Sequence, residues 1–187
     1  MKTQPVRHSL LVLLLSIAGL PLAHAECSVQ LSDAVIDYGS QTRGDLLQQN
    51  GNELTAAELS LGEERIIDVN ITCDRPAPLS LQFIAPARDS QSYSFGRSGK
   101  AVLKLYDASV DNQPAEIASN LAGTDRSQAI ILAADKRLTF WREGTRLSGS
   151  SLRAKVAIST YLPAGQTRVS DRQSWQLNGN FIVSDTE

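Results

Sequence analysis

Apolar and polar residues alternate along most of this sequence, and this period of two is the feature that most limits how it can fold. The alternation occurs in residues 27–31, 66–73, 79–83, 102–106, 152–158 and 175–183. It is the pattern of a strand that buries one face and exposes the other. Each of these runs is therefore predicted to form a half-buried β-strand.

Turn-forming residues separate the alternating runs. Asn50-Gly51 and Pro163-Ala164-Gly165 are two examples, since Gly, Asn and Pro each favour turns. Seven or eight short strands with turns between them, and no long helical period, predict an all-β sandwich or barrel. A helical turn or two is expected only in residues 54–61, which contain Ala56 and Ala57.

The N-terminus has the features of a secretory signal peptide. Lys2 and Arg7 precede an apolar run over residues 10–22, and Ala23-His24-Ala25 fits an A-x-A cleavage site. The run is shorter than the roughly 20 residues that a membrane-spanning helix needs. We therefore predict a signal peptide over residues 1–25 and a single secreted domain over residues 26–187, without a membrane-embedded segment.

Loss of the leader also removes both histidines, His8 and His24. Catalysis by Ser-His-Asp or Cys-His groups is then excluded, as are most zinc sites. Lys2 and Arg7 leave as well, so 16 of the 18 basic residues remain against 20 acidic ones, a net charge of −4. An acidic surface is a poor match for nucleic acid. We expect no enzyme activity, no cofactor, no metal and no nucleic-acid partner.

The two cysteines are Cys27 and Cys73, at the start of one strand-like run and the end of another. In an oxidising compartment the expected state is one disulfide between them. Closing a loop of this size stabilises a fold by about 4 kcal/mol in the chain-entropy model.

Several short motifs together resemble the subunits of bacterial chaperone–usher fimbriae, the pilins. They are Cys27-Ser28-Val29, Ile36-Asp37-Tyr38-Gly39, Ile71-Thr72-Cys73, the strand-like pair 79–83 and 102–106, and the C-terminal pair 154–161 and 177–181. The resemblance covers nearly all of residues 27–184. It implies an incomplete, pilin-type immunoglobulin-like sandwich that lacks its last strand. In such subunits a periplasmic chaperone fills the resulting groove, and the extension of the next subunit replaces it at the outer-membrane usher.

On this resemblance the groove would be lined by Val156, Ile158, Phe181 and Val183. The same residues would be apolar in the core of a complete sandwich, so the two interpretations stay open. Two departures bear on the choice. Only Glu26 lies between the predicted cleavage site and Cys27, which leaves no donor segment, and the sequence ends in residues 184–187 without a near-terminal aromatic residue. The expected role is that of a terminal or accessory subunit in a fimbrium at the cell surface, after passage through the periplasm.

The main alternative is a self-complete secreted sandwich that acts as a lectin-like adhesin. Phe140-Trp141-Arg142 places an aromatic residue beside a cation, as on sugar-binding faces, and Trp141 is the candidate ligand contact. The acid pairs Glu63-Glu64 and Asp107/Asp111 lie near expected turns, where acids are usually solvated, so we do not expect them to act as glycosidase carboxylates. For Asp107 and Asp111 we expect a turn-capping role and not calcium binding, because their spacing is not that of an EF-hand loop.

Overall fold

The computed structural model describes residues 25–168 and 172–184. The predicted signal peptide, apart from Ala25, lies outside the described residues, as do residues 185–187. The strands are β1 (Cys27–Leu31), β2 (Glu58–Ser60), β3 (Arg65–Ala77), β4 (Ser80–Ile84), β5 (Tyr93–Phe95), β6 (Gly99–Val110), β7 (Gln113–Pro114), β8 (Glu116–Ala118), β9 (Ala129–Ile131), β10 (Leu138–Arg142), β11 (Thr145–Arg146), β12 (Gly149–Pro163) and β13 (Asn180–Ser184). The helices are α1 (Arg43–Leu47) and the 3-10 turn η1 (Ala164–Thr167).

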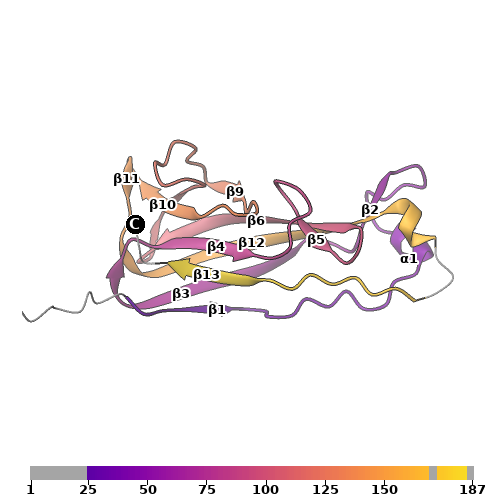
Figure 1. Ribbon diagram of the computed structural model, residues 1–187, viewed down its shortest axis with the longest axis horizontal. Helices are drawn as coiled ribbons and strands as arrows, with labels where there is room; N and C mark the ends of the chain where they lie inside the picture. Colours follow the sequence, from indigo (N-terminus) through magenta and orange to yellow (C-terminus); the bar gives the residue numbers. More distant parts are fainter. Residues whose placement is uncertain (1–24, 169–171, 185–187) are drawn as a thin grey trace, which may run out of the picture.

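These strands form two antiparallel sheets (Figure 1). The first sheet has the order β1-β3-β12-β6-β5, with β2 on β12 and with β7 and β9 on β6. The second has the order β11-β10-β4-β13, with β8 on β10. Each sheet therefore ends, on one side, in a strand from one end of the described residues: β1 in the first sheet and β13 in the second.

The core lies between the sheets and is made by the inward face of each alternating run. In the centre of the first sheet, Val156 of β12 is paired with Ile67 of β3 and with Leu105 of β6, and all three side chains are buried. From the second sheet, Leu81 and Phe140 are buried as well. The predicted all-β sandwich is confirmed, and so is its single disulfide, between Cys27 and Cys73.

The prediction of helical turns in residues 54–61 is wrong. The described α-helix is α1, which begins after Thr42, where the side chains of Thr42 and Asp45 form a reciprocal capping box. Residues 58–60 form β2 instead, because the end of β12 offers them a partner strand. Leu59 pairs with Leu162 and is fully buried. The strand pairing and burial of Leu59 outweigh the helix propensity of Ala56 and Ala57.

Candidate functional site at the open edge of the sandwich

The first strand, β1, pairs with β3 along one of its two edges. Cys27 and Cys73 are direct partners in the β1–β3 register, with their Cα atoms 4.0 Å apart. Just before the strand, the Glu26 N–H donates to the Asp74 carboxylate at 2.9 Å, and the Asp74 N–H donates to the Glu26 carbonyl at 3.0 Å. The other edge of β1 pairs with no strand within residues 25–168 and 172–184. β1 is thus an edge strand, with one row of backbone groups left unpaired.

The last described strand, β13, has the same property in the second sheet. It pairs with β4 through Asn180↔Ile84 and Phe181↔Phe83, and in the described part of the protein it has no partner on its other side. The Phe181 ring packs on Phe83 with centroids 4.9 Å apart, and the Phe83 ring meets the edge of Tyr93 at 5.0 Å. These aromatic contacts hold β13 on the core.

Residues 172–179 precede β13 in the sequence and form no β-ladder. The Gly96 N–H donates to the Gln176 carbonyl at 2.9 Å, and the Trp175 ring lies against Gly96 so closely that a Cβ there would be 2.8 Å from it. Gly179 in turn lies against the Phe83 ring, with no room for a side chain. The segment is therefore held by a few separate contacts, whereas β13 is held by continuous pairing.

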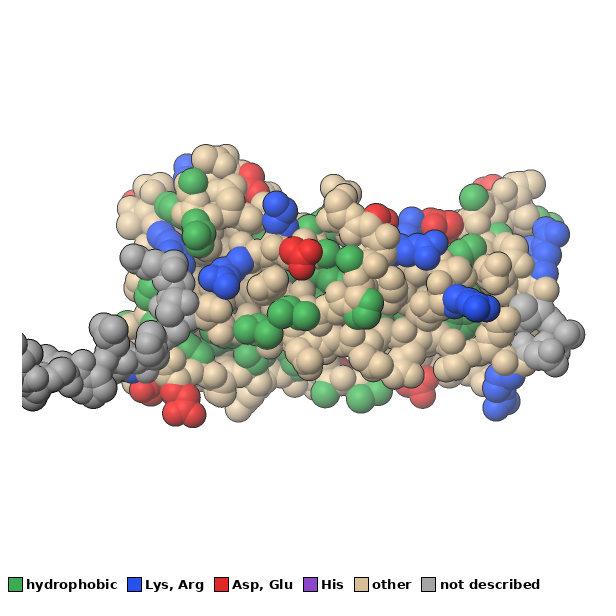
Figure 2. All heavy atoms as spheres, viewed as in Figure 1, with side chains coloured by type: hydrophobic (Ala, Val, Ile, Leu, Met, Phe, Trp, Pro, Cys, Tyr) green, Lys and Arg blue, Asp and Glu red, His purple; other side chains and the backbone are tan. Residues whose placement is uncertain are grey.

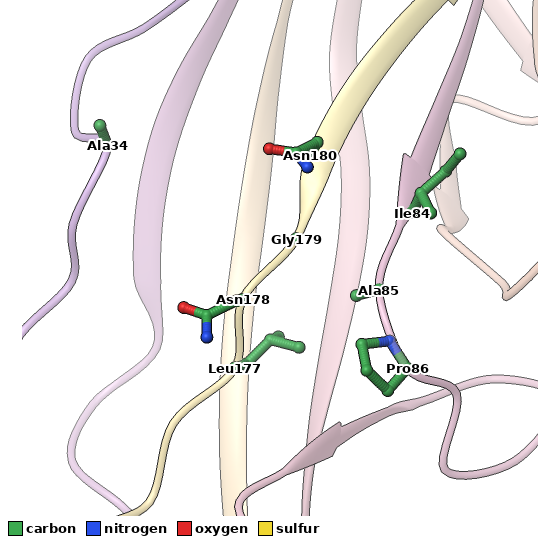
Figure 3. A pocket seen from close by; sticks show the side chains of 8 residues that line it. All are labelled: Ala34, Ile84, Ala85, Pro86, Leu177, Asn178, Gly179 and Asn180. Atoms are coloured by element: carbon green, nitrogen blue, oxygen red, sulfur yellow. The ribbon is translucent and has the colours of Figure 1, made fainter.

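The two unpaired edges lie side by side, because β1 and β13 approach within 8 Å between Cα atoms (Figure 1). We call this region the open edge, formed by β1 and residues 32–38 on one side and residues 175–184 on the other. A cavity of about 540 Å³ opens to solvent there, lined by Ala34, residues 84–86 and residues 177–180. Figure 3 shows Ala34 on one side of the gap and Asn178 pointing toward that side from the other.

Apolar side chains along the open edge are only partly buried, unlike those of the central strands. They are Cys27, Val29, Leu31, Ile36, Tyr38, Trp175, Leu177, Phe181 and Val183, and all pack against the core from its margin. Three of the six large hydrophobic side chains that are exposed in the described residues also border this region: Val35, Ile84 and Ile182. Figure 2 shows hydrophobic side chains at the surface across the middle of this face. The core is incompletely covered along this one edge.

The structure separates the four groove residues expected from the sequence. Phe181 and Val183 lie on β13 at the open edge, half-buried. Val156 does not reach it, because it is fully buried in the middle of the first sheet, and Ile158 lies on the same central strand and is partly exposed. The expectation for Val156 is corrected accordingly. The alternation of β1 was recognised as a strand, but no sequence signal showed that Val29 and Leu31 would face an unpaired margin.

The exposed aromatic surface expected at Trp141 is absent. Phe140 is fully buried and Trp141 is 9% exposed. The indole N–H donates to the Thr139 hydroxyl at 2.7 Å, the Arg126 guanidinium lies 5.6 Å from the ring centroid, and Gly123 packs directly on the ring. The loop that contains Gly123 and Arg126 covers the ring on which a sugar would stack. That cover removes the observation on which a sugar-binding role for Trp141 was based.

Within the described residues, no three His, Cys, Asp or Glu side chains gather closely enough to hold a metal ion. None of the described helices has the length and apolar character needed to cross a membrane. The acid at the β6 turn, Asp111, accepts hydrogen bonds from Ser150 and Ser151, which is the capping role expected for it. No known protein-family model matches the sequence, and no curated protein sequence does either.

Proposed function

We propose that this protein is a fimbrial-type structural subunit whose sandwich accepts a β-strand from a partner protein at the open edge. The observation that carries the proposal is the pair of edge strands, β1 and β13, whose edges without a partner in the described residues lie side by side with half-buried apolar side chains along them. An edge strand presents a row of free N–H and C=O groups, a template on which an extended segment can pair. Because two such edges lie beside one gap, an added strand could form hydrogen bonds with β1 along one of its edges and with β13 along the other.

The side chains at the open edge determine what kind of strand would fit. Val29 and Leu31 alternate with the exposed Ser28 and Gln30, and the half-buried residues of β13 alternate with exposed ones. An added strand would therefore place every second side chain over the core and the others in solvent. Burying the half-exposed apolar area would stabilise the complex by about 25 cal/mol for each Å² removed from water.

The distance between β1 and β13 determines whether they must move apart to admit an added strand. Strands that flank a third in one sheet lie about 9.5 Å apart, twice the ordinary spacing. β1 and β13 lie within 8 Å of each other, so a strand that paired with both would have to separate them there. Farther along, the cavity beside Ala34 and Gly179 already provides room. The accepting region is thus narrow between β1 and β13 and open beside Ala34.

The proposed partners follow from the resemblance to chaperone–usher subunits. A periplasmic pilus chaperone would cover the open edge first, an outer-membrane usher would assemble the subunit, and another pilus subunit would supply the final strand. The place of action would be the periplasm in transit and then a fimbrium at the cell surface, with a part in pilus formation and cell adhesion. The covered indole of Trp141 gives the lectin-like alternative no comparable support.

The test is stabilisation of the full-length protein by an added strand. The protein is exported with its own leader and purified, and thermal unfolding is measured with a short peptide of alternating apolar and polar residues. A peptide of the same composition but without alternation is the control. We expect the alternating peptide alone to raise the melting temperature, because a ligand at 100 times its Kd stabilises the native state by about 2.7 kcal/mol. If the lone protein is a stable monomer and neither peptide shifts its melting, the sandwich is complete and the proposal fails.

A matched pair of variants locates the binding. Val29→Asp places a charge on the half-buried face of β1, whereas Gln30→Asp changes the next, exposed residue of the same strand. The peptide-induced rise in melting temperature should disappear in the first variant and persist in the second, each measured against its own peptide-free baseline. An equal rise in both would mean that the peptide binds elsewhere.

A further inference from the structure

The open edge contains a dipeptide with its own chemistry, Asn178–Gly179. The protein has seven asparagines, and only Asn50 and Asn178 are followed by glycine. Asn178 and Gly179 are both exposed, and both line the cavity at the open edge. A glycine after asparagine leaves the intervening backbone nitrogen unshielded, because glycine has no side chain and the most backbone freedom.

We propose that Asn178–Gly179 is a site of spontaneous deamidation. The backbone nitrogen of Gly179 attacks the amide carbonyl carbon of the Asn178 side chain, and the new C–N bond closes a succinimide ring. The bond between that carbon and the amide nitrogen breaks, and the nitrogen leaves as ammonia with the proton given up by the Gly179 nitrogen. Water then adds to one of the ring's carbonyl carbons, and ring opening leaves aspartate or isoaspartate at position 178. Water is the only co-reactant, and no oxidation or reduction occurs.

The hydrogen bonding around Gly179 leaves the attacking nitrogen available. The β13–β4 ladder begins at Asn180, one residue later, and the Gly179 N–H has no hydrogen-bond partner within residues 25–168 and 172–184. On the other side, the nearest backbone anchor is the Gln176 carbonyl, bonded to Gly96. The Asn178 side chain accepts one hydrogen bond, from the exposed Gln176 amide at 2.8 Å. Ring closure at Asn178 therefore breaks one exposed hydrogen bond between side chains and no ladder bond.

The glycine that makes the asparagine reactive is also required by the packing. A Cβ at position 179 would overlap the Phe83 ring, which lies between Tyr93 and Phe181. A larger residue at position 179 would slow ring closure but would displace this ring. The reactivity of Asn178 and the packing of the second sheet therefore both require glycine at position 179.

The product would change the open edge itself. Aspartate adds a negative charge beside Ala34 and Leu177, at the cavity. Isoaspartate also adds a methylene to the backbone, which lengthens the connection between Leu177 and Gly179 just before the ladder begins at Asn180. This step rests on the proposed function: a strand accepted at the open edge would bring residues 177–179 into a ladder, fix their backbone and slow the reaction. Deamidation would then limit how long an unfilled subunit remains able to accept a strand.

Asn50–Gly51 provides a control within the same molecule. Gly51 has a φ of +83°, in a turn that the next residue braces, because the Asn52 side chain donates to the Leu46 and Ser60 carbonyls and accepts from the Ser60 N–H. This turn follows α1 and does not border the cavity at the open edge. A strand bound at that edge should leave the reaction at Asn50 unchanged.

The experiment follows both sites over time by peptide mass spectrometry, with isoaspartate measured by enzymatic methyl labelling. The purified full-length protein is incubated at neutral pH alone, with the alternating peptide, and after unfolding in urea as a reference. We expect deamidation at Asn178 in the folded, free protein, a several-fold slower reaction with the peptide bound, and no effect of the peptide at Asn50. Asn178→Gln should remove the isoaspartate signal from that peptide fragment.

The outcomes separate the two proposals. If Asn178 stays intact in the folded protein while the urea reference reacts there, the modification site is refuted, whatever the peptide does. If the peptide raises the melting temperature but does not slow the reaction at Asn178, the link between strand binding and deamidation is refuted. If the peptide shifts neither melting nor the fluorescence of the half-buried Trp175, the acceptor function fails, and the free-protein time course still decides the modification.

Discussion

Asp111 and Ser151 are joined by three hydrogen bonds that connect the turn after β6 to β12. The Asp111 N–H donates to the Ser151 carbonyl at 3.0 Å, and the Ser151 N–H and hydroxyl donate to Oδ1 of Asp111 at 2.9 and 3.1 Å. The N–H of Ser150 donates to the same oxygen at 3.1 Å. The β12 register with β3 shifts between Gly149 and Ser151, so one carboxylate braces an irregular part of a long strand.

Asp111→Ala is expected to lower the free energy of unfolding by about 0.5–1.5 kcal/mol, because two solvent-accessible backbone N–H groups lose their acceptor. Asp111 also has a φ of +47°, a conformation that alanine tolerates less well than aspartate or asparagine. Asp111→Asn keeps an acceptor oxygen and should cost less. Denaturant unfolding of the three proteins measures the difference, and equal midpoints for wild type and Asp111→Ala would show that the brace does not stabilise the fold.

Stability should fall in acid but stay level around neutral pH. Burial alone would raise the pKa of Asp111, but hydrogen bonds from Ser151 and Ser150 outweigh it and lower the pKa below 3.8. The hydroxyl of Ser119 likewise lowers the pKa of Asp125. A carboxyl with a lowered folded-state pKa stabilises the fold fully above its unfolded pKa and loses that effect as pH falls through the folded value.

Thermal unfolding across pH checks this prediction. Residues 25–187 contain no histidine, so no side chain there has an ordinary pKa between 5 and 8. The melting temperature should stay level between about pH 5 and 8 and drop below about pH 4. A marked change in melting temperature near pH 6.5 would contradict it.

Tyr93 should make the fold sensitive to alkali. Its side chain is fully buried and its hydroxyl donates to the Phe83 carbonyl at 3.2 Å. Burial, and then the negative charge of Asp135, raise the pKa of Tyr93 from 10.0 to about 12. The neutral phenol is favoured by folding, so its contribution is complete below pH 10 and is lost as pH rises through about 12. Tyr93→Phe should flatten the loss of stability between about pH 10 and 12 relative to wild type, and parallel curves would refute this.

The sequence predicted which side chains face the core more reliably than where a ladder begins. The alternation in 175–183 predicted one strand, but the ladder begins only at Asn180, because its partner β4 ends at Ile84. Trp175 and Leu177 keep their half-buried pattern without a partner strand. Alternation reports which side chains face the core, and hydrogen bonding depends on a neighbour that the local sequence does not specify.

The same limit explains the mixed outcome for the candidate site. Val156 and Val183 have the same alternating surroundings, yet one lies between two partner strands and the other on an edge strand. Trp141 follows a similar rule: its exposure is decided by the loop around Gly123, about 18 residues away in sequence, which covers the ring. Local pattern identified the faces of the strands, whereas long-range pairing and loop packing decided which faces are open.

Gly179→Ala should destabilise the second sheet. The added Cβ would overlap the Phe83 ring, whose contacts with Tyr93 and Phe181 hold β13 on the core. Overpacking of this kind costs about 1–3 kcal/mol. Gly165→Ala is the matched control, because a Cβ there meets nothing within 4 Å, and it should change the free energy of unfolding by less than about 0.5 kcal/mol. Similar unfolding midpoints for the two variants would mean that the ring can move aside freely.

Removal of the disulfide should weaken β1 more than any other strand. Cys27 and Cys73 are 46 residues apart. In the chain-entropy model, a disulfide that closes a loop of this length raises the free energy of unfolding by about 4 kcal/mol. With both cysteines changed to serine, β1 would keep its ladder to β3 but not its covalent anchor, and its other edge has no strand in the described part of the protein to hold it. Hydrogen exchange should then rise first at Ser28 and Gln30, whose N–H groups point toward β3 in the alternating antiparallel ladder, while the central Val69 and Val156 stay protected. Uniform loss of protection across β1, β3 and β12 would show instead that the bond stabilises the sandwich as one cooperative unit.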